Sequence, residues 1–169
     1  GAYLNALGEI VVHGLERDSV FLWTLPLFHC NGWCFPWAVT AAGGAHVMLR
    51  KVDPPEMLRQ IRAHGVTHFN GAPTVLLMLA EHPDAQGVRF DPPIRVATGG
   101  APPSPTLLAR MEALGVRVTH LYGLTETYGP HVYCQLQGEW EGLDVEAKAK
   151  VMARQGVPYH VATHLRVVD

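Results

Sequence analysis

The 169-residue sequence contains few lysines, and nowhere do basic residues gather into a patch. Its only lysines are Lys51, Lys148 and Lys150, and the formal charge is −2 at pH 7 with histidine neutral. A protein that binds nucleic acid needs a positive surface to meet the phosphates. The sequence therefore predicts no nucleic-acid partner.

Long apolar runs and an even set of cysteines are also missing. The longest apolar run, residues 75–80, is far too short to cross a bilayer as a helix. The three cysteines, Cys30, Cys34 and Cys134, do not make an even disulfide framework, and we identify no secretory leader. We expect a protein without a transmembrane segment in a reducing compartment, with the cytoplasm as the default location.

The composition and patterning indicate a globular α/β domain. Hydrophobic residues make up 48% and charged residues 17%, which favours a folded core over disorder. Short strand-like runs alternate with helical patterns, and this alternation predicts a parallel sheet flanked by helices through βαβ repeats. The strand candidates are residues 20–25, 46–50, 67–70, 94–98, 116–121 and 165–169.

Several helices have recognisable starts or faces. Asp53 and Ser104 each precede a proline and are expected to cap a helix, and a further helix is expected from Pro73 to about Glu81. An opening helix over residues 2–13 would place Leu4, Leu7 and Val11 on one face, and the charged stretch 139–154 predicts a solvated surface helix.

In open parallel sheets, ligands bind beyond the carboxyl ends of the strands. Three segments follow predicted strands in this way: residues 70–74, 98–103 and 122–127. The pair Gly99-Gly100 would let a flat ligand approach the backbone, but taken alone it favours a strand-to-helix turn that merely needs small residues.

The segment from Tyr122 to Thr127 is more specific. It combines an aromatic ring for stacking, hydroxyl donors, and the carboxylate of Glu126, which could hold Mg²⁺ beside phosphates. The alternative is an ordinary helix start capped by Thr125 or Thr127. Spacing alone leaves both interpretations open.

His29 lies among bulky apolar residues after the first strand and either packs there or lines an apolar cavity. A zinc site is poorly supported, because His29, Cys30 and Cys34 form no paired metal-binding motif. A serine hydrolase is poorly supported as well, since the sequence has no GxSxG elbow.

Taken together, the segments 25–33, 71–74, 99–103 and 122–130 resemble the AMP-forming acyl-CoA synthetases of the adenylate-forming superfamily. The resemblance runs through essentially the whole chain. It implies that the chain is a partial AMP-binding domain over residues 1–169, lacking the upstream phosphate loop and the C-terminal lid domain with its lysine. We would then expect the chain alone to be inactive.

The resemblance also implies roles for individual residues. Thr125 would bond the α-phosphate, Glu126 would hold Mg²⁺, and His29 would lie near the reacting carboxylate. The nucleotide would be bound by Gly99, Gly100, Ala101, Tyr122, Gly123 and Thr125, and the acyl pocket would be formed by His29, Trp33, Gly71, Gly100 and Leu124.

The implied activity uses ATP and Mg²⁺ to convert a fatty or other carboxylic acid to an acyl-adenylate and transfers the acyl group to coenzyme A. All of these partners are small molecules, and a homo-oligomer is compatible with them. Alternatives are an acyl-AMP ligase that loads a carrier protein, a non-catalytic nucleotide- or acyl-binding domain, and a plain interaction domain.

Overall fold

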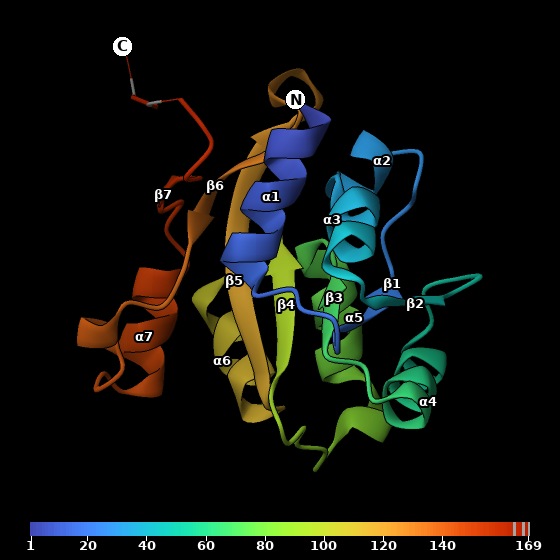
Figure 1. Ribbon diagram of the computed structural model, residues 1–169. Coiled ribbons are helices and arrows are strands. Elements are labelled where there is room, and N and C mark those ends of the chain that lie inside the picture. Colours follow the sequence, from blue (N-terminus) through green and yellow to red (C-terminus); the bar gives the residue numbers. More distant parts are fainter. Residues whose placement is uncertain (164, 167, 169) are drawn as a thin grey trace.

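A seven-stranded sheet lies between two layers of helices (Figure 1) in the computed structural model, which describes residues 1–163, 165, 166 and 168. The strand order is β2-β1-β3-β4-β5-β6-β7. The strands are β1 (Val20–Trp23), β2 (Ala45–Met48), β3 (His68–Asn70), β4 (Ile94–Thr98), β5 (Val116–Leu124), β6 (Gly129–Cys134) and β7 (Val157–Pro158).

The predicted parallel sheet is confirmed for β1 to β5, which all pair in parallel. Two antiparallel strands extend it, because β6 pairs with β5 and β7 pairs with β6. No pattern in the sequence predicted this antiparallel extension. The chain reverses through a tight turn after Leu124 in which Tyr128 takes a left-handed φ of 64°, so β6 returns directly beside β5.

Helices form where the capping residues predicted them. Asp53 Oδ2 accepts a hydrogen bond from Glu56 N at 3.3 Å, and Ser104 Oγ accepts one from Leu107 N at 3.2 Å. The α-helices are α1 (Ala2–His13), α2 (Cys30–Trp33), α3 (Phe35–Ala42), α4 (Pro54–His64), α5 (Pro73–Glu81), α6 (Pro105–Ala113) and α7 (Val145–Met152). Three short 3₁₀ turns are η1 (Pro83–Ala85), η2 (Thr125–Thr127) and η3 (Gly138–Trp140).

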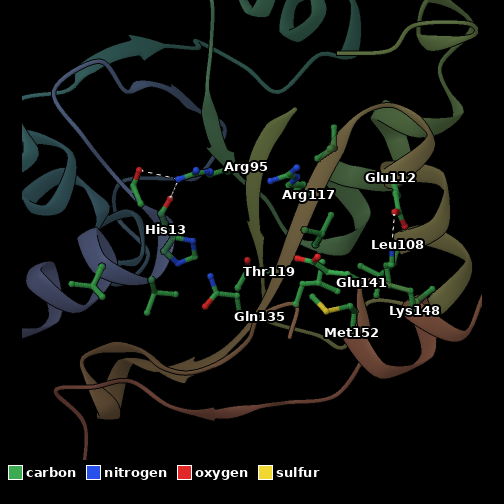
Figure 2. A pocket seen from close by; sticks show the side chains of 17 residues that line it. His13, Arg95, Leu108, Glu112, Arg117, Thr119, Gln135, Glu141, Lys148 and Met152 are labelled. Carbon is green, nitrogen blue, oxygen red and sulfur yellow. Dashed lines mark hydrogen bonds and ion pairs between the residues drawn. The ribbon is translucent and has the colours of Figure 1, made fainter. Parts of the chain in front are cut away.

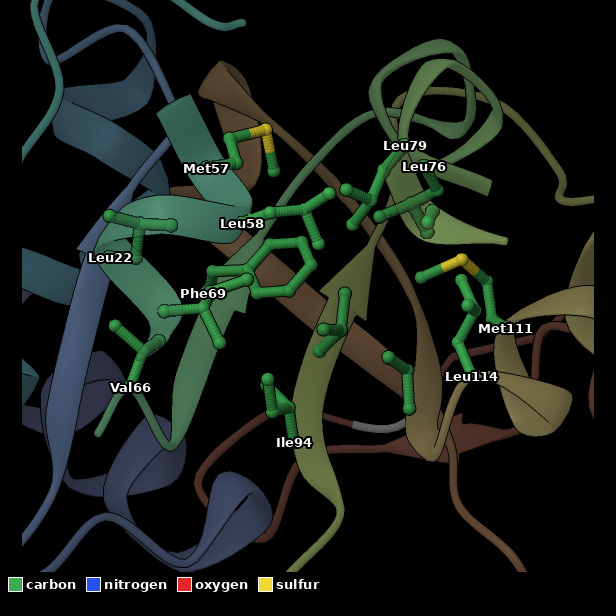
Figure 3. Close-up of a cluster of buried hydrophobic side chains, with 14 of the residues drawn as sticks. Leu22, Met57, Leu58, Val66, Phe69, Leu76, Leu79, Ile94, Met111 and Leu114 are labelled. Carbon is green, nitrogen blue, oxygen red and sulfur yellow. The ribbon is translucent and has the colours of Figure 1, made fainter. Parts of the chain in front are cut away.

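Each face of the sheet has its own core. Adjacent residues of a strand point to opposite faces, so Leu22 joins the cluster with α4, α5 and α6 (Figure 3), whereas Phe21 and Trp23 join the cluster with α1 and α3. Phe69 and Leu76, both fully buried, lie in the first cluster. This double covering holds the carboxyl ends of the parallel strands in fixed positions.

The apolar face expected on α1 does not face the sheet. Leu4, Leu7 and Val11 are exposed, and the buried side of α1 carries polar groups instead, including Glu9 and His13. The helix spans the expected residues 2–13, but its apolar stripe lies on the exposed side. Here the buried side is stabilised by specific hydrogen bonds, which hydropathy does not report.

Glu9, His13 and Tyr159 form a buried polar cluster behind α1. Tyr159 donates its hydroxyl hydrogen to Glu9 Oε2 at 2.9 Å, and His13 Nε2 lies 3.2 Å from the same oxygen. Burial raises the pKa of Glu9 well above its usual value. Burial, with a smaller contribution from Arg95, lowers the pKa of His13 to about 3.

Two further expectations had mixed outcomes. Within residues 139–154 the structure has only η3 and α7, and the Ala149 and Met152 side chains of α7 are buried against α6 rather than solvated. The strand expected over 165–169 includes Val167 and Asp169, which lie outside the described residues. None of the described helices combines the length and apolar character needed to cross a membrane.

Candidate functional site

All but one of the site residues predicted from the sequence meet in one cavity of about 330 Å³ at the carboxyl ends of β4 and β5. Four parts of the chain line it: the turn after β1, the loop after β4, the end of β5 with the turn into β6, and Gln155 after α7. The predicted residues among its lining are His29, Trp33, Gly99, Gly100, Ala101, Tyr122, Gly123, Leu124, Thr125 and Glu126.

The segment after Leu121 is part strand and part turn. Tyr122, Gly123 and Leu124 belong to β5 rather than to a loop, because each pairs with β6 or adjoins its bulge. Thr127 Oγ1 accepts a hydrogen bond from Leu124 N at 2.8 Å and closes the η2 turn. The local capping role therefore falls to Thr127, while Thr125 and Glu126 line the cavity.

The glycines after β4 are needed for two different reasons. A Cβ on Gly99 would lie 3.0 Å from the Leu121 carbonyl oxygen and 3.5 Å from the Trp33 ring, so the backbone there fits closely against both. Gly100 has a φ of +80° with open space beside it, so its conformation rather than crowding favours glycine. Open space beside Gly100, which lines the cavity, leaves room for a flat ligand.

The turn after β1 contains the short segment α2, and its backbone is left-handed rather than that of a regular α-helix. Cys30, Asn31, Trp33 and Cys34 all have positive φ values between 46° and 66°, and Gly32 between them has 60°. This conformation costs about 1–2 kcal/mol for each residue other than glycine. Such strain persists only where the surroundings fix it, and it clusters at functional sites.

Close packing fixes the left-handed turn on both sides. A Cβ on Gly32 would lie 2.6 Å from the Trp23 ring of β1, so only glycine fits against that indole. On the other side a Cβ on Gly129, at the start of β6, would lie 2.8 Å from Cys34 Sγ. The turn is therefore held between β1 and β6, and it carries His29, Cys30 and Trp33 to the cavity.

Glu126 offers one hard oxygen donor group to a cation. Its carboxylate forms no ion pair with any described residue and is exposed at the cavity. Mg²⁺ is commonly held by one or two protein carboxylates together with substrate phosphates, and the single carboxylate fits that arrangement. Across the described residues, no group of three or more histidine, cysteine or acidic side chains could hold a metal by itself.

Gly71 is the one predicted site residue that does not line the cavity. It is buried at the end of β3, where its N–H donates to the Ala97 carbonyl at 3.0 Å and a Cβ would lie 3.2 Å from Val75 of α5. Its position is explained by close packing of α5 against the end of the strand.

The cavity is also lined by six residues that were not predicted from the sequence. These are Cys30, His120, Leu121, Gly129, Pro130 and Gln155. Cys30, Gly129 and Pro130 fall inside segments already singled out, so their neighbours were a usable signal. His120 and Gln155 come together because His120 Nδ1 bonds the Arg154 carbonyl at 3.0 Å, a tertiary contact that no local pattern predicts. Burial lowers the pKa of His120.

A larger cavity of about 600 Å³ lies elsewhere (Figure 2). It wraps around the first half of β5, where β6 no longer pairs, since the β5–β6 register begins only at His120. Arg95 and Arg117 lie beside each other on its wall, and Lys148 pairs with Glu112 at 3.2 Å. None of the predicted site residues lines it.

Comparison with known proteins identifies the family. The AMP-binding enzyme family matches residues 1–169. The chain belongs to this AMP-binding enzyme family. It is 44% identical over 169 residues to 4-hydroxybutyrate–CoA ligase 2 of Metallosphaera sedula. It is also 44% identical over 170 residues to the peroxisomal acetate/butyrate–CoA ligase AAE7 of Arabidopsis thaliana. All of this chain is covered in both matches, but only 31% and 30% of the relatives' own lengths.

Solved structures of the same fold agree. O-succinylbenzoate CoA synthetase from Bacillus subtilis, in complex with the acyl-adenylate intermediate OSB-AMP, matches with a TM-score of 0.77 and 25% identity over 94% of this chain and 30% of that one. The N-terminal domain of FACL13 from Mycobacterium tuberculosis matches with a TM-score of 0.81 at 19% identity, over 94% of this chain and 38% of that one. The expected fold of an adenylate-forming N-terminal domain is thereby confirmed.

Proposed function

We propose that these 169 residues are the nucleotide- and acid-binding part of an AMP-forming acid–CoA ligase. The observation that carries this proposal is the cavity in which the turn after β1, the loop after β4 and the end of β5 meet. The relatives at 41–44% identity that are named for an activity are CoA ligases. Because they are about three times as long as this chain, the complete activity needs parts outside it.

The cavity suggests how the two substrates divide. The ring of Tyr122, which is partly exposed, is available to stack on the adenine beside Gly99, Gly100 and Ala101. Thr125 would donate its hydroxyl hydrogen to the α-phosphate, and Glu126 would hold Mg²⁺ against the phosphates. On the other side His29, Trp33 and Leu124 would receive the acid, with Gly71 contributing only behind this wall.

The proposed reaction has two steps. A carboxylate oxygen of the acid attacks the α-phosphorus of ATP, forming the acyl-adenylate and releasing pyrophosphate. The thiol of coenzyme A then attacks the acyl carbon, forming the thioester and releasing AMP. In the first step two anions meet, so the Mg²⁺ charge and the Thr125 donor would offset their repulsion.

We propose small aliphatic acids as the substrate class. The relatives are named for 4-hydroxybutyrate, acetate or butyrate, and 2-methylpropanoate. A buried methylene contributes about 0.8 kcal/mol, roughly a fourfold change in binding. Measuring kcat/KM for acetate, butyrate, hexanoate and 4-hydroxybutyrate would test the class; preference for a long-chain acid over all four would refute it.

The activity is best tested in a protein of full synthetase length that carries these residues. Replacing Glu126 by Gln removes the proposed Mg²⁺ ligand and should lower ATP-dependent thioester formation at least tenfold without unfolding the protein. Glu139→Gln is the matched control, because Glu139 is an exposed glutamate outside the cavity. Equal activity in the two variants would contradict the proposed site.

The same assay separates the remaining possibilities. Pyrophosphate release without any coenzyme A thioester would indicate an acyl-AMP ligase that serves a carrier protein. Neither product would indicate a non-catalytic binding domain. We expect the 169 residues alone to make no acyl-adenylate at a useful rate, since the phosphate loop and the lid lysine of the family are not identified in them.

For location we retain the cytoplasm as the proposal, although several relatives are named as peroxisomal. Imaging a fluorescent fusion of the full-length protein in its own cells tests this directly. Sedimentation velocity of the full-length protein would test whether it forms a homo-oligomer.

A further inference from the structure

We propose that Cys30 is a positioning residue for the nucleotide half of the site: its S–H donates to Thr125 Oγ1 and so directs the Thr125 O–H toward the nucleotide. The inference rests on the proposed function, because it assigns Thr125 a phosphate to bind. It concerns a side chain that has no role in the two chemical steps themselves.

The contact joins two distant parts of the chain. Cys30 Sγ lies 3.0 Å from Thr125 Oγ1, across 95 positions of sequence, and both residues line the cavity. Cys30 comes from the left-handed turn after β1, and Thr125 opens the η2 turn after β5. The meeting of their side chains is therefore a product of the fold and not of local sequence.

The number of hydrogens that Thr125 can donate decides which of the two side chains is the donor once a nucleotide is bound. A threonine hydroxyl has one hydrogen to donate and two lone pairs to accept with, and an ionised phosphate oxygen can only accept. If Thr125 donates to the phosphate, it has no hydrogen left for Cys30. The thiol must then be the donor, and its bond fixes the rotation of the hydroxyl.

A second thiol keeps the two turns in register. Cys34 Sγ donates to the Tyr128 carbonyl oxygen at 3.3 Å, three residues beyond Thr125. Burial raises the pKa of Cys34 to about 12, so this thiol keeps its hydrogen at neutral pH. Because Gly129 also packs closely on Cys34 Sγ, the left-handed turn cannot slide past the η2 turn without breaking this packing.

The arrangement links the acid side of the cavity to the nucleotide side. His29 and Trp33 flank Cys30 and lie on the wall where we place the acid. A displacement of Thr125 relative to this turn would therefore change the distance between the two reacting groups. Fixing that distance is what an enzyme needs in order to align a carboxylate with the α-phosphorus.

The test is a double-mutant cycle in a protein of full synthetase length that carries these residues. Cys30→Ala should lower kcat/KM for ATP by about three- to tenfold, as expected for one lost hydrogen bond, and leave KM for coenzyme A unchanged. Cys30→Ser keeps a donor at the same place and should recover most of the loss. In a Thr125→Val background, Cys30→Ala should have no further effect on kcat/KM for ATP.

Several outcomes would overturn the inference. Additive effects of Cys30→Ala and Thr125→Val, or a Cys30→Ser variant as impaired as Cys30→Ala, would show that the thiol does not act through the hydroxyl. Cys134→Ala is the control for losing a thiol, because buried Cys134 lies outside the cavity and should leave kcat/KM for ATP unchanged. A wild-type protein without ATP-dependent acid activation would refute the proposed function and this inference together, whereas an active wild type with an additive cycle refutes the inference alone.

Discussion

Gly123 is the position where the structure makes its sharpest prediction about the site. It lies at the bulge between β5 and β6, and a Cβ there would lie 2.6 Å from the Gly129 carbonyl carbon and 2.7 Å from Pro130 Cα, with the Gly129 carbonyl oxygen closer still. All three atoms belong to the backbone, so no side chain can rotate away. Gly123→Ala must push β6 outward until these contacts reach ordinary separations.

The expected cost follows from this geometry. Overpacking of this kind costs about 1–3 kcal/mol, and for a chain of this size about 1 kcal/mol lowers the melting temperature by roughly 2–4 °C. The displaced β6 would also carry away the Gly129 carbonyl, which accepts from Thr127 Oγ1 at 3.1 Å and helps to hold the η2 turn. Weaker nucleotide binding should accompany the loss of stability.

Urea unfolding of the 169-residue chain, followed by circular dichroism, measures the stability change. Gly142→Ala is the matched control, because a Cβ there meets no heavy atom within 4 Å and its φ is not left-handed. The control should stay within about 0.5 kcal/mol of the wild type. If Gly123→Ala is as stable as the control, the close β5–β6 approach at the site is refuted.

Two further predictions concern stability alone. Asp53→Ala removes the N-cap of α4 and should cost about 1 kcal/mol in urea unfolding; no change would mean that the 3.3 Å bond to Glu56 N adds nothing. The second concerns pH. Burial lowers the pKa of His13 to about 3 and the pKa of His68 to about 4. Both histidines are therefore protonated near pH 6.5 in the unfolded chain but stay neutral in the folded chain, so the free energy of unfolding falls as the pH drops below about 6.5. Glu9 acts in the opposite sense, because its raised pKa makes stability fall as the pH rises. Glu9→Gln should therefore steepen the loss of stability between pH 6.5 and 5, and an unchanged pH profile would contradict the buried cluster.

Much of the fold was accessible from sequence because its signals are local. The Asp53 and Ser104 caps and the alternation of strands with helices depend on residues within a few positions of each other, and each was confirmed. Side-chain capping and strand periodicity require no knowledge of the rest of the chain. The five parallel strands follow from these elements, since their crossover connections allow few arrangements.

The structural features that could not be predicted from the sequence depend on contacts between distant residues. The buried side of α1 is polar because Glu9 meets Tyr159 and Asn5 donates to the Pro130 carbonyl at 2.9 Å, and neither partner is visible in a helical periodicity. The antiparallel return of β6 depends on the left-handed conformation of Tyr128. Tyrosine rarely adopts this conformation, so the residue type does not predict the turn. Local rules fail where tertiary contacts override them.

In the site, too, some features follow from residue type and others depend on contacts between distant residues. The strained turn belongs to the second kind. The glycines and the threonine–glutamate pair could be proposed as site residues from residue type, because their chemistry is intrinsic to the residues. The left-handed turn from Cys30 to Cys34 could not be predicted, because cysteine and tryptophan do not favour that conformation. In this chain the packing between β1 and β6 imposes it. A strained segment that presents His29, Cys30 and Trp33 to one cavity would relax if its surroundings were removed. The close packing of Gly32 on Trp23 and of Gly129 on Cys34 thus keeps the turn in a left-handed conformation that its residues would not adopt on their own.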